Sequence, residues 1–300
     1  MSTVTVRVPA KVNLQLAVGG SRPDGFHELA TVYQALSLYD DITAIAGDQL
    51  TISVEGEGAD LVPMDETNLA WRAAQELAEQ AGLEPRAHLH IHKGIPVGGG
   101  HAGGSADAAG ALLALDLLWD TRLDRDELTV IGARLGSDVP FALHGHTAIG
   151  VGRGERLTPA LARGRYHWVL ALADLGLSTP AVYAELDRLR SGSVQAEPRV
   201  SDGLMSALRS GDPVLLGREL SNDLQRAAVS LRPALAMTLD VGEEYGALAS
   251  LVSGSGPTCA FLARDEEHAL DLAVALTSSG TCRTVRRAFG PVAGARPVVD

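Results

Sequence analysis

Residues 96–109 read PVGGGHAGGSADAA, and this stretch decides how the rest of the chain is interpreted. Five of the seven residues from Gly98 to Gly104 are glycine. The flanking patterns predict a β-strand at 87–92 and a strongly apolar, buried helix at 105–119. Glycine permits positive φ angles and exposes backbone N–H groups, and the positive end of a helix dipole attracts anions. The stretch therefore predicts a phosphate-binding loop at the start of a helix.

Two common phosphate-binding patterns can be tested against the spacing of these glycines. Gly98, Gly100 and Gly103 satisfy G-x-G-x-x-G, but no strand with a terminal acidic residue follows the helix at the distance that a ribose contact needs. The P-loop pattern G-x-x-x-x-G-K-[ST] requires lysine where this chain has Gly104. A classical P-loop is excluded, and a dinucleotide-dependent oxidoreductase is left as a poorly supported alternative.

Outward from the loop, the sequence predicts alternating strands and helices in two domains. Residues up to about 55 alternate apolar and polar side chains as β-strands do. Thr67 or Asn68 is expected to begin a helix that Gly82 ends. A hairpin at 147–159 is expected to cross between the domains, and 191–201 reads as a polar linker. The other expected elements are helices at 125–135, 212–220, 234–245 and 266–278, one beginning at 178–180, and strands at 167–173, 258–262 and 283–288.

Composition and charge narrow the class of protein. The chain has 300 residues, 46% hydrophobic and 21% charged, as globular proteins do, and no run of 18 apolar residues spans a bilayer. Its start carries no export signal, so a cytoplasmic location is expected. The net charge of −12 argues against a nucleic-acid partner. A small-molecule substrate is therefore expected, whereas the oligomeric state stays open.

Cysteine and histidine give no metal site. Cys259 and Cys282 lack the spacing of a zinc site or a disulfide framework and are interpreted as buried small apolar residues. His88, His90 and His92 alternate along one predicted strand, which indicates a half-exposed polar face. Metal ligands are therefore left open.

Lysine is scarce in this chain. Of 25 basic residues, 23 are arginine and only Lys11 and Lys93 are lysine. A compact ammonium is not interchangeable with a planar guanidinium where space is tight. We therefore expect each lysine to mark a position that arginine does not fit.

Three segments resemble the ordered motifs of the GHMP small-molecule kinases: residues 9–14 (PAKVNL), 96–109 and 252–257 (VSGSGP). The resemblance implies an α+β, two-domain GHMP kinase fold. Residues 1–155 would form a β-rich nucleotide-binding domain of the ribosomal-S5-like type, and residues 156–300 a ferredoxin-like domain. One departure is Ala102, where the family more often has glycine, and its methyl group is expected to narrow the conformations of the loop.

Within the family, residues 22–29 (RPDGFHEL) and 135–141 (LGSDVPF) are similar to kinases that act on a cytidine diphosphate derivative. The implied activity is ATP-dependent phosphorylation, with Mg²⁺, of the 2-hydroxyl of 4-diphosphocytidyl-2-C-methyl-D-erythritol, an isoprenoid precursor of the non-mevalonate pathway. Asp138 would receive the hydroxyl proton, with Lys11 as its positively charged neighbour. Phosphoryl transfer needs such positioning and charge stabilisation. The alternatives are a family member acting on mevalonate or homoserine and a catalytically silent sensor.

The resemblance also implies two sets of binding residues. The aromatic side chains would sandwich the pyrimidine and His27 would read its edge. Ser105 is expected to orient the phosphates or Mg²⁺, assisted by Asp107. The nucleotide-binding set is Asn68, Lys93, Pro96, Gly98, Gly99, Gly100, Gly103, Gly104 and Ser105. The acceptor-binding set is Asn13, Asp24, Phe26, His27, Tyr33, Tyr183, Gly254, Ser255 and Gly256.

Overall fold

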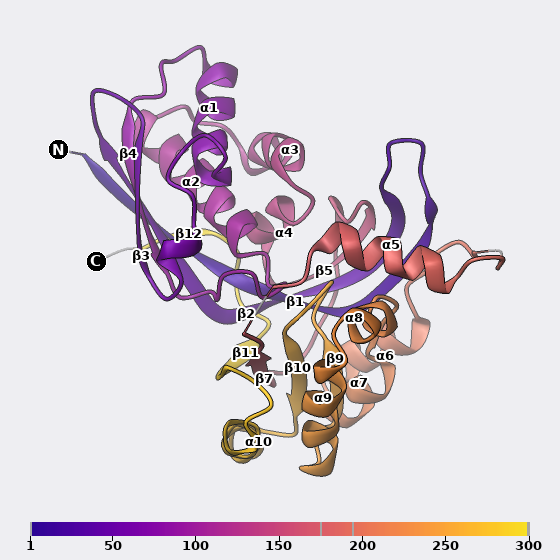
Figure 1. The fold of residues 1–300 in the computed structure, drawn as a ribbon. Coiled ribbons are helices and arrows are strands. Elements are labelled where there is room, and N and C mark those ends of the chain that lie inside the picture. The colour runs from indigo at the N-terminus through magenta and orange to yellow at the C-terminus, as the bar shows by residue number, and fades with distance from the viewer. Residues whose placement is uncertain (1, 175, 194, 299–300) are drawn as a thin grey trace.

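A computed structural model describes residues 2–174, 176–193 and 195–298 of the chain (Figure 1). Its first sheet has the order β12-β1-β2-β4-β3, with β5 and β8 paired to β2 and β1 and β6 paired to β5. The strands are β1 (Thr3–Ser21), β2 (His27–Ala46), β3 (Thr51–Gly56), β4 (Ala87–Lys93), β5 (Thr147–Gly152), β6 (Arg156–Pro159), β8 (Ser221–Asn222) and β12 (Arg296–Pro297).

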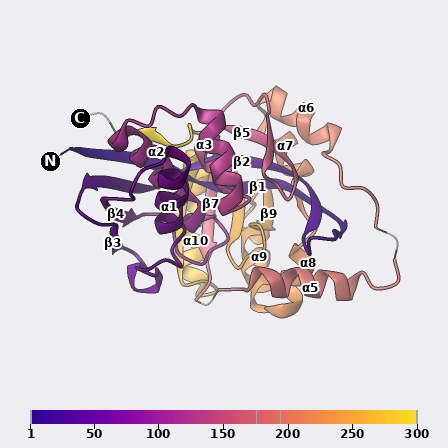
Figure 2. The same cartoon turned by 90° about the horizontal axis from the view of Figure 1, so that it is seen from above.

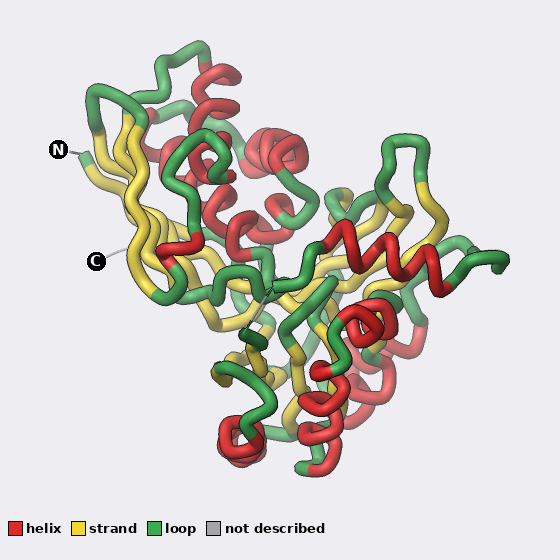
Figure 3. The backbone as a smooth tube through the Cα atoms, in the orientation of Figure 1, coloured by secondary structure: helices red, strands yellow, loops and turns green. Residues whose placement is uncertain are grey.

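Four helices cover one face of this sheet, as the tube in Figure 3 shows. They are α1 (Leu69–Ala81), α2 (Gly103–Trp119), α3 (Arg125–Leu135) and α4 (Val139–His144), and a short 3₁₀ helix, η1 (Ala59–Leu61), precedes them. Helix α2 is buried almost all round between the sheet and its neighbours, as its apolar sequence predicts. It is followed along the chain by α3 and α4 rather than by a strand parallel to β4, so no Rossmann βαβ unit contains the glycine loop.

The second sheet is antiparallel and has the order β11-β7-β10-β9. Read in chain order this is 4-1-3-2, the arrangement of a ferredoxin-like βαββαβ unit. The α+β, two-domain prediction is therefore confirmed. The strands are β7 (Tyr166–Leu172), β9 (Ala249–Val252), β10 (Cys259–Ala263) and β11 (Thr284–Gly290), and the helices are α5 (Thr179–Leu189), α6 (Asp202–Ser210), α7 (Pro213–Glu219), α8 (Gln225–Leu231), α9 (Ala234–Glu244) and α10 (Glu266–Ser279).

Strands β1 and β2, of 19 and 20 residues, tie the two halves together. Their far ends extend past the first core toward α5 and α8 (Figure 2). Leu16, Val18 and Leu29 belong to a second core, which also contains residues of β7, β10 and α10. The chain returns to the first sheet at β12, and the hairpin β5–β6 spans residue 155. The division of the chain at residue 155 stays a prediction.

Candidate active site

A cleft with a volume of about 730 Å³ lies where the glycine loop, the β1–β2 hairpin, α5 and the 254–256 turn meet. A second cavity, of about 70 Å³, is far smaller. A cleft of several hundred Å³ is the size of a small-molecule site. The predicted residues that line it are Lys11, Asn13, Phe26, His27, Tyr33, Gly98, Gly99, Gly100, Gly103, Gly104, Ser105, Asp138, Tyr183, Gly254, Ser255 and Gly256.

Lys11 and Asp138 form the charged centre of the cleft. The Lys11 Nζ atom lies 3.6 Å from Oδ2 of Asp138 and donates a 2.7 Å hydrogen bond to Oδ1 of Asn13. Lys11 is only 7% exposed, which excludes a generic surface charge. Asp138 occupies the N-cap position of α4, but its side chain makes no capping hydrogen bond. The carboxylate is therefore free to act in the cleft instead of stabilising the helix.

All three predicted motifs meet at Gly254. A methyl group on this residue would lie 3.4 Å from Lys11 Nζ, 3.4 Å from the Gly100 carbonyl oxygen and 3.5 Å from Asn13 Oδ1. Gly254 has φ 57°, in the left-handed region. Glycine adopts this conformation without steric cost. The turn at 254–256 thus lies directly against Lys11 and the glycine loop.

The local structure of β1 aims Lys11 and Asn13 into the cleft. They are two residues apart on one strand, so their side chains lie on the same face. The β1–β2 register shifts between Pro9 and Ala10 and again after Asn13. Such bulges re-aim side chains next to active sites.

The glycine loop leads directly into α2, as the sequence predicts. Helix α2 begins at Gly103, so the N–H groups of its first turn and its positive dipole end face the cleft. Ala102 precedes the helix with φ 59° and ψ 35°. This left-handed conformation is one that a residue with a Cβ atom adopts at a cost of roughly 1–2 kcal/mol. The methyl group of Ala102 therefore strains the backbone of the loop at this residue.

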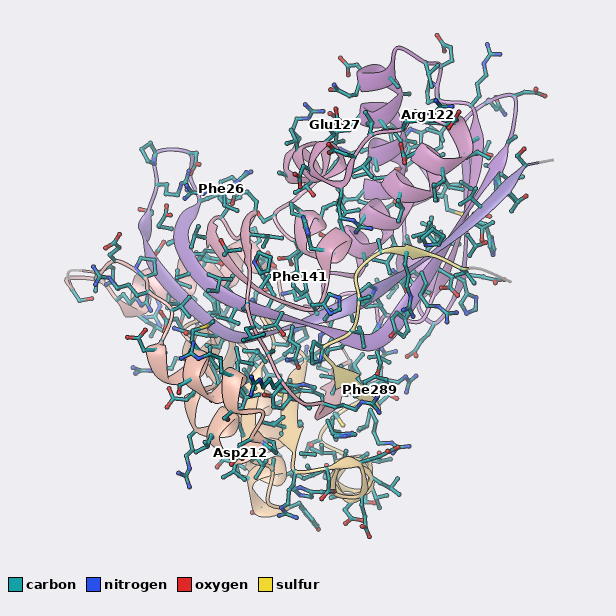
Figure 4. The ribbon with its side chains drawn as sticks, turned by 180° about the vertical axis from the view of Figure 1, so that it is seen from behind. Phe26, Arg122, Glu127, Phe141, Asp212 and Phe289 are labelled. Carbon is teal, nitrogen blue, oxygen red and sulfur yellow. The ribbon has the colours of Figure 1, made fainter. Side chains whose placement is uncertain are left out.

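An aromatic group forms the other end of the cleft. The rings of His27 and Tyr183 have centroids 4.9 Å apart, and His27 Nε2 lies 2.9 Å from Oδ1 of Asp187. Burial raises the pKa of Tyr183, so its hydroxyl stays neutral at physiological pH. Phe26 is 49% exposed at the tip of the β1–β2 hairpin, where Figure 4 shows it, and the Arg153 guanidinium carbon lies 4.9 Å from its ring centroid.

Tyr33 connects the aromatic and charged parts of the cleft. Its ring stacks on Phe141 at 4.8 Å, and Lys11 Nζ lies 5.7 Å from the ring centroid. Burial, with the nearby Asp138 carboxylate, raises the pKa of Tyr33 well above its usual value. A methyl group on Gly154 would lie 2.3 Å from the Tyr33 hydroxyl oxygen, so this glycine makes room for it. Tyr33 therefore forms part of the cleft wall beside Lys11 and Asp138.

Asn68, Asp24 and Pro96 do not line the cleft among the residues described. Asn68 caps α1: its Oδ1 accepts from Ala70 N at 2.8 Å and its Nδ2 donates to the Pro63 carbonyl. Asp24 accepts from Phe26 N at 3.1 Å and pairs with Arg22, which shapes the hairpin turn. Direct nucleotide or acceptor contacts of these three residues stay predictions.

Lys93 also lies outside the cleft, in a buried charge cluster. Its Nζ atom lies 2.5 Å from Asp40 Oδ2 and 2.8 Å from Asp107 Oδ2, and its side chain is 2% exposed. Asp40 also accepts from the backbone N–H groups of Gly94 and Ile95. Burial raises the pKa of Asp107, although Lys93 opposes the shift. The cluster links α2 to β2 and β4. A nucleotide contact by Lys93 stays a prediction.

The cleft residues that the sequence prediction missed include Arg153, Thr179 and Asp187. Asp187 lies four residues after Tyr183 on α5, so helical spacing places both on one face. Thr179 Oγ1 lies 2.8 Å from Ser255 Oγ, which joins α5 to the third motif. Arg153 sits in the tight turn between β5 and β6, where only its glycine neighbours gave a signal.

The structure also shows where the cysteines and the three histidines of β4 lie. Cys259 is buried and Cys282 partly buried, and both are free thiols. His88, His90 and His92 are tied by hydrogen bonds to Thr51, Ser53 and Glu55 on β3. Across the described ranges, no group of three or more His, Cys, Asp or Glu side chains is arranged to hold a metal ion. None of the helices that the structure describes is long and apolar enough to span a bilayer.

Comparison with known proteins defines the class to which this fold and site belong. Residues 68–146 match the GHMP kinases N terminal domain, and residues 204–282 match the GHMP kinases C terminal domain. The chain therefore belongs to the GHMP kinase family.

Relatives with known names point to one branch of the family. A 4-diphosphocytidyl-2-C-methyl-D-erythritol kinase from Streptomyces avermitilis is 60% identical, over 98% of this chain and 99% of that protein. One of the same name from Nocardia farcinica is 59% identical, over 100% of this chain and 97% of its own. A crystal structure of 4-(cytidine 5'-diphospho)-2C-methyl-D-erythritol kinase, 32% identical, matches with a TM-score of 0.76, covering 95% of this chain and 98% of that one.

The fold is shared more widely than the sequence. A homoserine kinase from Cytophaga hutchinsonii is 17% identical but reaches a TM-score of 0.75, covering 99% of this chain and 98% of that one. At this identity the likeness concerns the fold alone. The similarity to the first group extends over nearly the whole chain.

Proposed function

We propose that this enzyme transfers the γ-phosphoryl group of ATP to the 2-hydroxyl of 4-diphosphocytidyl-2-C-methyl-D-erythritol. The observation that carries the proposal is the Lys11–Asp138 contact of 3.6 Å, in one cleft with the glycine loop and an aromatic group. The named relatives at 59–60% identity support the choice of acceptor. ATP is the phosphoryl donor of the family. An isolated charge pair would not by itself distinguish a kinase from other transferases.

Three parts of the cleft have different roles in the proposed reaction. The backbone N–H groups of the glycine loop and the first turn of α2 hold the phosphates of ATP. Phe26, His27 and Tyr183 hold the cytosine, by stacking and through hydrogen bonds to the edge of the ring. Between these ends, the 2-hydroxyl reaches the catalytic pair. The cleft thus orients donor and acceptor for in-line transfer.

The chemical step needs one proton acceptor and one fixed cation. The hydroxyl oxygen forms a bond to the γ-phosphorus as the bond to the ADP oxygen breaks, and the hydroxyl proton passes to the Asp138 carboxylate. The Lys11 ammonium stabilises negative charge on the transferring group and the carboxylate. Asn13 fixes the ammonium through the 2.7 Å hydrogen bond to its Oδ1. An active pair of this kind disfavours the silent-sensor alternative.

We also propose that Mg²⁺ enters with ATP as part of the substrate. Mg²⁺ is commonly bound through substrate phosphates and one or two protein oxygens rather than by a complete protein cage. The Ser105 hydroxyl lies in the cleft at the start of α2 and is a suitable single oxygen ligand. A cytoplasmic location and the absence of a nucleic-acid partner stay predictions.

The test is to identify both products of the reaction. The enzyme is incubated with MgATP and the acceptor, and the products are examined by mass spectrometry and phosphorus NMR. We expect ADP and an acceptor with one added phosphate on the 2-hydroxyl, in equal amounts. ADP without a phosphorylated acceptor would mean that the cleft hydrolyses ATP and would contradict the proposed transfer.

A further inference from the structure

His101 stands inside the glycine loop but turns away from the cleft. In the stretch 98–104, His101 is the one residue with a side chain longer than a methyl group. It is only 1% exposed and does not line the cleft. Its neighbours Gly100 and Ala102 both have left-handed backbones, with φ 78° and 59°. The loop therefore directs this side chain into the protein interior.

The imidazole connects the three motifs of the site. His101 Nδ1 lies 3.1 Å from the carbonyl oxygen of Lys11 on β1. It also lies 3.5 Å from Oγ of Ser253, just before the turn that closes over the cleft. Since a carbonyl oxygen only accepts hydrogen bonds, Nδ1 carries the proton and donates it. One side chain of the phosphate loop thus contacts the backbone of the catalytic lysine.

The charge state of His101 follows from its surroundings. Its Nε2 atom is buried, with no hydrogen-bond partner among the described residues. Burial lowers the pKa of His101 to about 4, and the Lys11 ammonium lowers it too, against the opposing effect of the hydrogen bond to the Lys11 carbonyl. Protonation would add a buried N–H without an acceptor, close to a second positive charge. The ring is therefore neutral at physiological pH.

We propose that His101 is a positioning residue, whose hydrogen bond to the Lys11 carbonyl holds the catalytic lysine at a fixed distance from the phosphate-binding loop. In the proposed reaction, the loop binds the phosphates of ATP, whereas Lys11 and Asp138 contact the hydroxyl group of the acceptor. A misplacement of 1 Å between reacting groups costs about 10²-fold in rate. The glycines of the loop cannot replace this interaction, because glycine has no side chain that could form a hydrogen bond to β1. The proposal rests on the kinase activity proposed above.

Two variants separate the hydrogen bond from simple packing. His101→Asn keeps an N–H donor close to the position of Nδ1, whereas His101→Leu fills the space with no donor. We expect His101→Leu to lower kcat at least tenfold, with less than threefold changes in KM for ATP and for the acceptor. His101→Asn is expected to keep kcat within threefold of the wild type. Both are assayed well below their melting temperatures, so that loss of fold does not enter the rates.

A second measurement tests the burial of the neutral ring independently of catalysis. Because the folded-state pKa lies below the unfolded value of about 6.5, the unfolded chain binds more protons as the pH falls, and the wild type loses stability on acidification. We expect the melting temperature of His101→Asn to fall by fewer degrees than that of the wild type between pH 7 and pH 5. An equal fall would contradict the buried neutral imidazole.

The outcomes distinguish the two levels of the proposal. If the wild type makes no phosphorylated acceptor, the proposed function fails. If the wild type is active and His101→Leu keeps more than half of its kcat, or if the Asn and Leu variants lose kcat equally, the positioning role is overturned while the kinase activity stands.

Discussion

The Lys11 ammonium lies 3.6 Å from the Asp138 carboxylate, although 127 residues separate them in the chain. Strand β1 supplies the first and the N-terminus of α4 supplies the second. Gly254 lets the third motif approach the pair closely, since a methyl group there would lie 3.4 Å from Lys11 Nζ. The tertiary structure thus brings a carboxylate and an ammonium group together in the cleft where the glycine loop ends.

Replacing Asp138 by Asn should remove the proton acceptor with little change in shape. We expect a loss in kcat on the order of 10²–10⁴, the usual contribution of general acid–base catalysis. The control is Asp187→Asn, another carboxylate of the cleft, which pairs with His27 and is expected to alter the acceptor KM more than kcat. A loss below tenfold for Asp138→Asn would mean that Asp138 only positions the hydroxyl.

Replacing Lys11 by Arg keeps the charge but changes its shape. The ammonium is buried between Asn13 and Asp138, so the broader guanidinium should displace one of them and lower kcat about 10²-fold. The same assay on Lys11→Ala gives the effect of losing the charge. On the same strand, Arg7 is a partly exposed partner of Asp41 and does not line the cleft, so Arg7→Lys should leave kcat unchanged. An arginine variant with more than half of the wild-type kcat would show that charge alone suffices.

Removing an aromatic ring from the cytosine end should weaken acceptor binding selectively. Tyr183→Ala is expected to cost roughly 1–3 kcal/mol, which raises the acceptor KM about 5- to 150-fold with little effect on the KM for ATP. Phe26→Ala should act in the same direction. Tyr245 is 59% exposed and does not line the cleft, so Tyr245→Ala serves as the control. A defect confined to the KM for ATP would refute the assignment of the aromatic end to cytosine.

Relieving the strained backbone at Ala102 should stabilise the protein. Glycine adopts the observed φ of 59° freely, so Ala102→Gly is expected to raise the free energy of unfolding by up to about 1 kcal/mol. In the regular interior of α10, Ala273→Gly should instead lower it by roughly 0.5–1 kcal/mol. Urea unfolding of both variants measures the two changes. A loss of stability in Ala102→Gly would show that the methyl group makes favourable contacts that outweigh the strain.

Local patterns in the sequence predicted much of the fold. Asn68 and Gly82 cap α1 as expected, because capping depends on residues within one turn of the helix end. Helix α8 and strand β9 were not predicted, since they span only 7 and 4 residues. Helix α6 is strongly amphipathic but was missed, because it directly follows the stretch 191–201 that was interpreted as a polar linker. The strand order of the second sheet depends on pairing between strands that are distant in the chain. The family resemblance implied this order, whereas hydrophobic periodicity carries no information about it.

In the candidate site, too, local motifs were predicted from the sequence, whereas contacts between distant residues were not. Motifs in the sequence identified the glycine loop, Lys11 and Asp138, and all of them line the cleft. Both lysines are buried beside carboxylates, whereas the expectation that arginine does not fit at these positions stays a prediction. The partners of Lys93 were not predicted, because Asp40 is 53 residues away in the chain. Arg153, in the β5–β6 turn, likewise lines the cleft. No local sequence pattern predicts which part of the protein this turn contacts. Contacts of this kind follow from tertiary packing alone.

The most direct test of the proposed function is ADP release from MgATP with three acceptors: 4-diphosphocytidyl-2-C-methyl-D-erythritol, mevalonate and homoserine. Asp138→Asn is assayed in parallel to exclude contaminating kinases. We predict rapid ADP release with the cytidine diphosphate derivative alone, because only this acceptor can occupy the aromatic end while its hydroxyl reaches Lys11 and Asp138. Equal rates with mevalonate or homoserine would contradict the proposed acceptor.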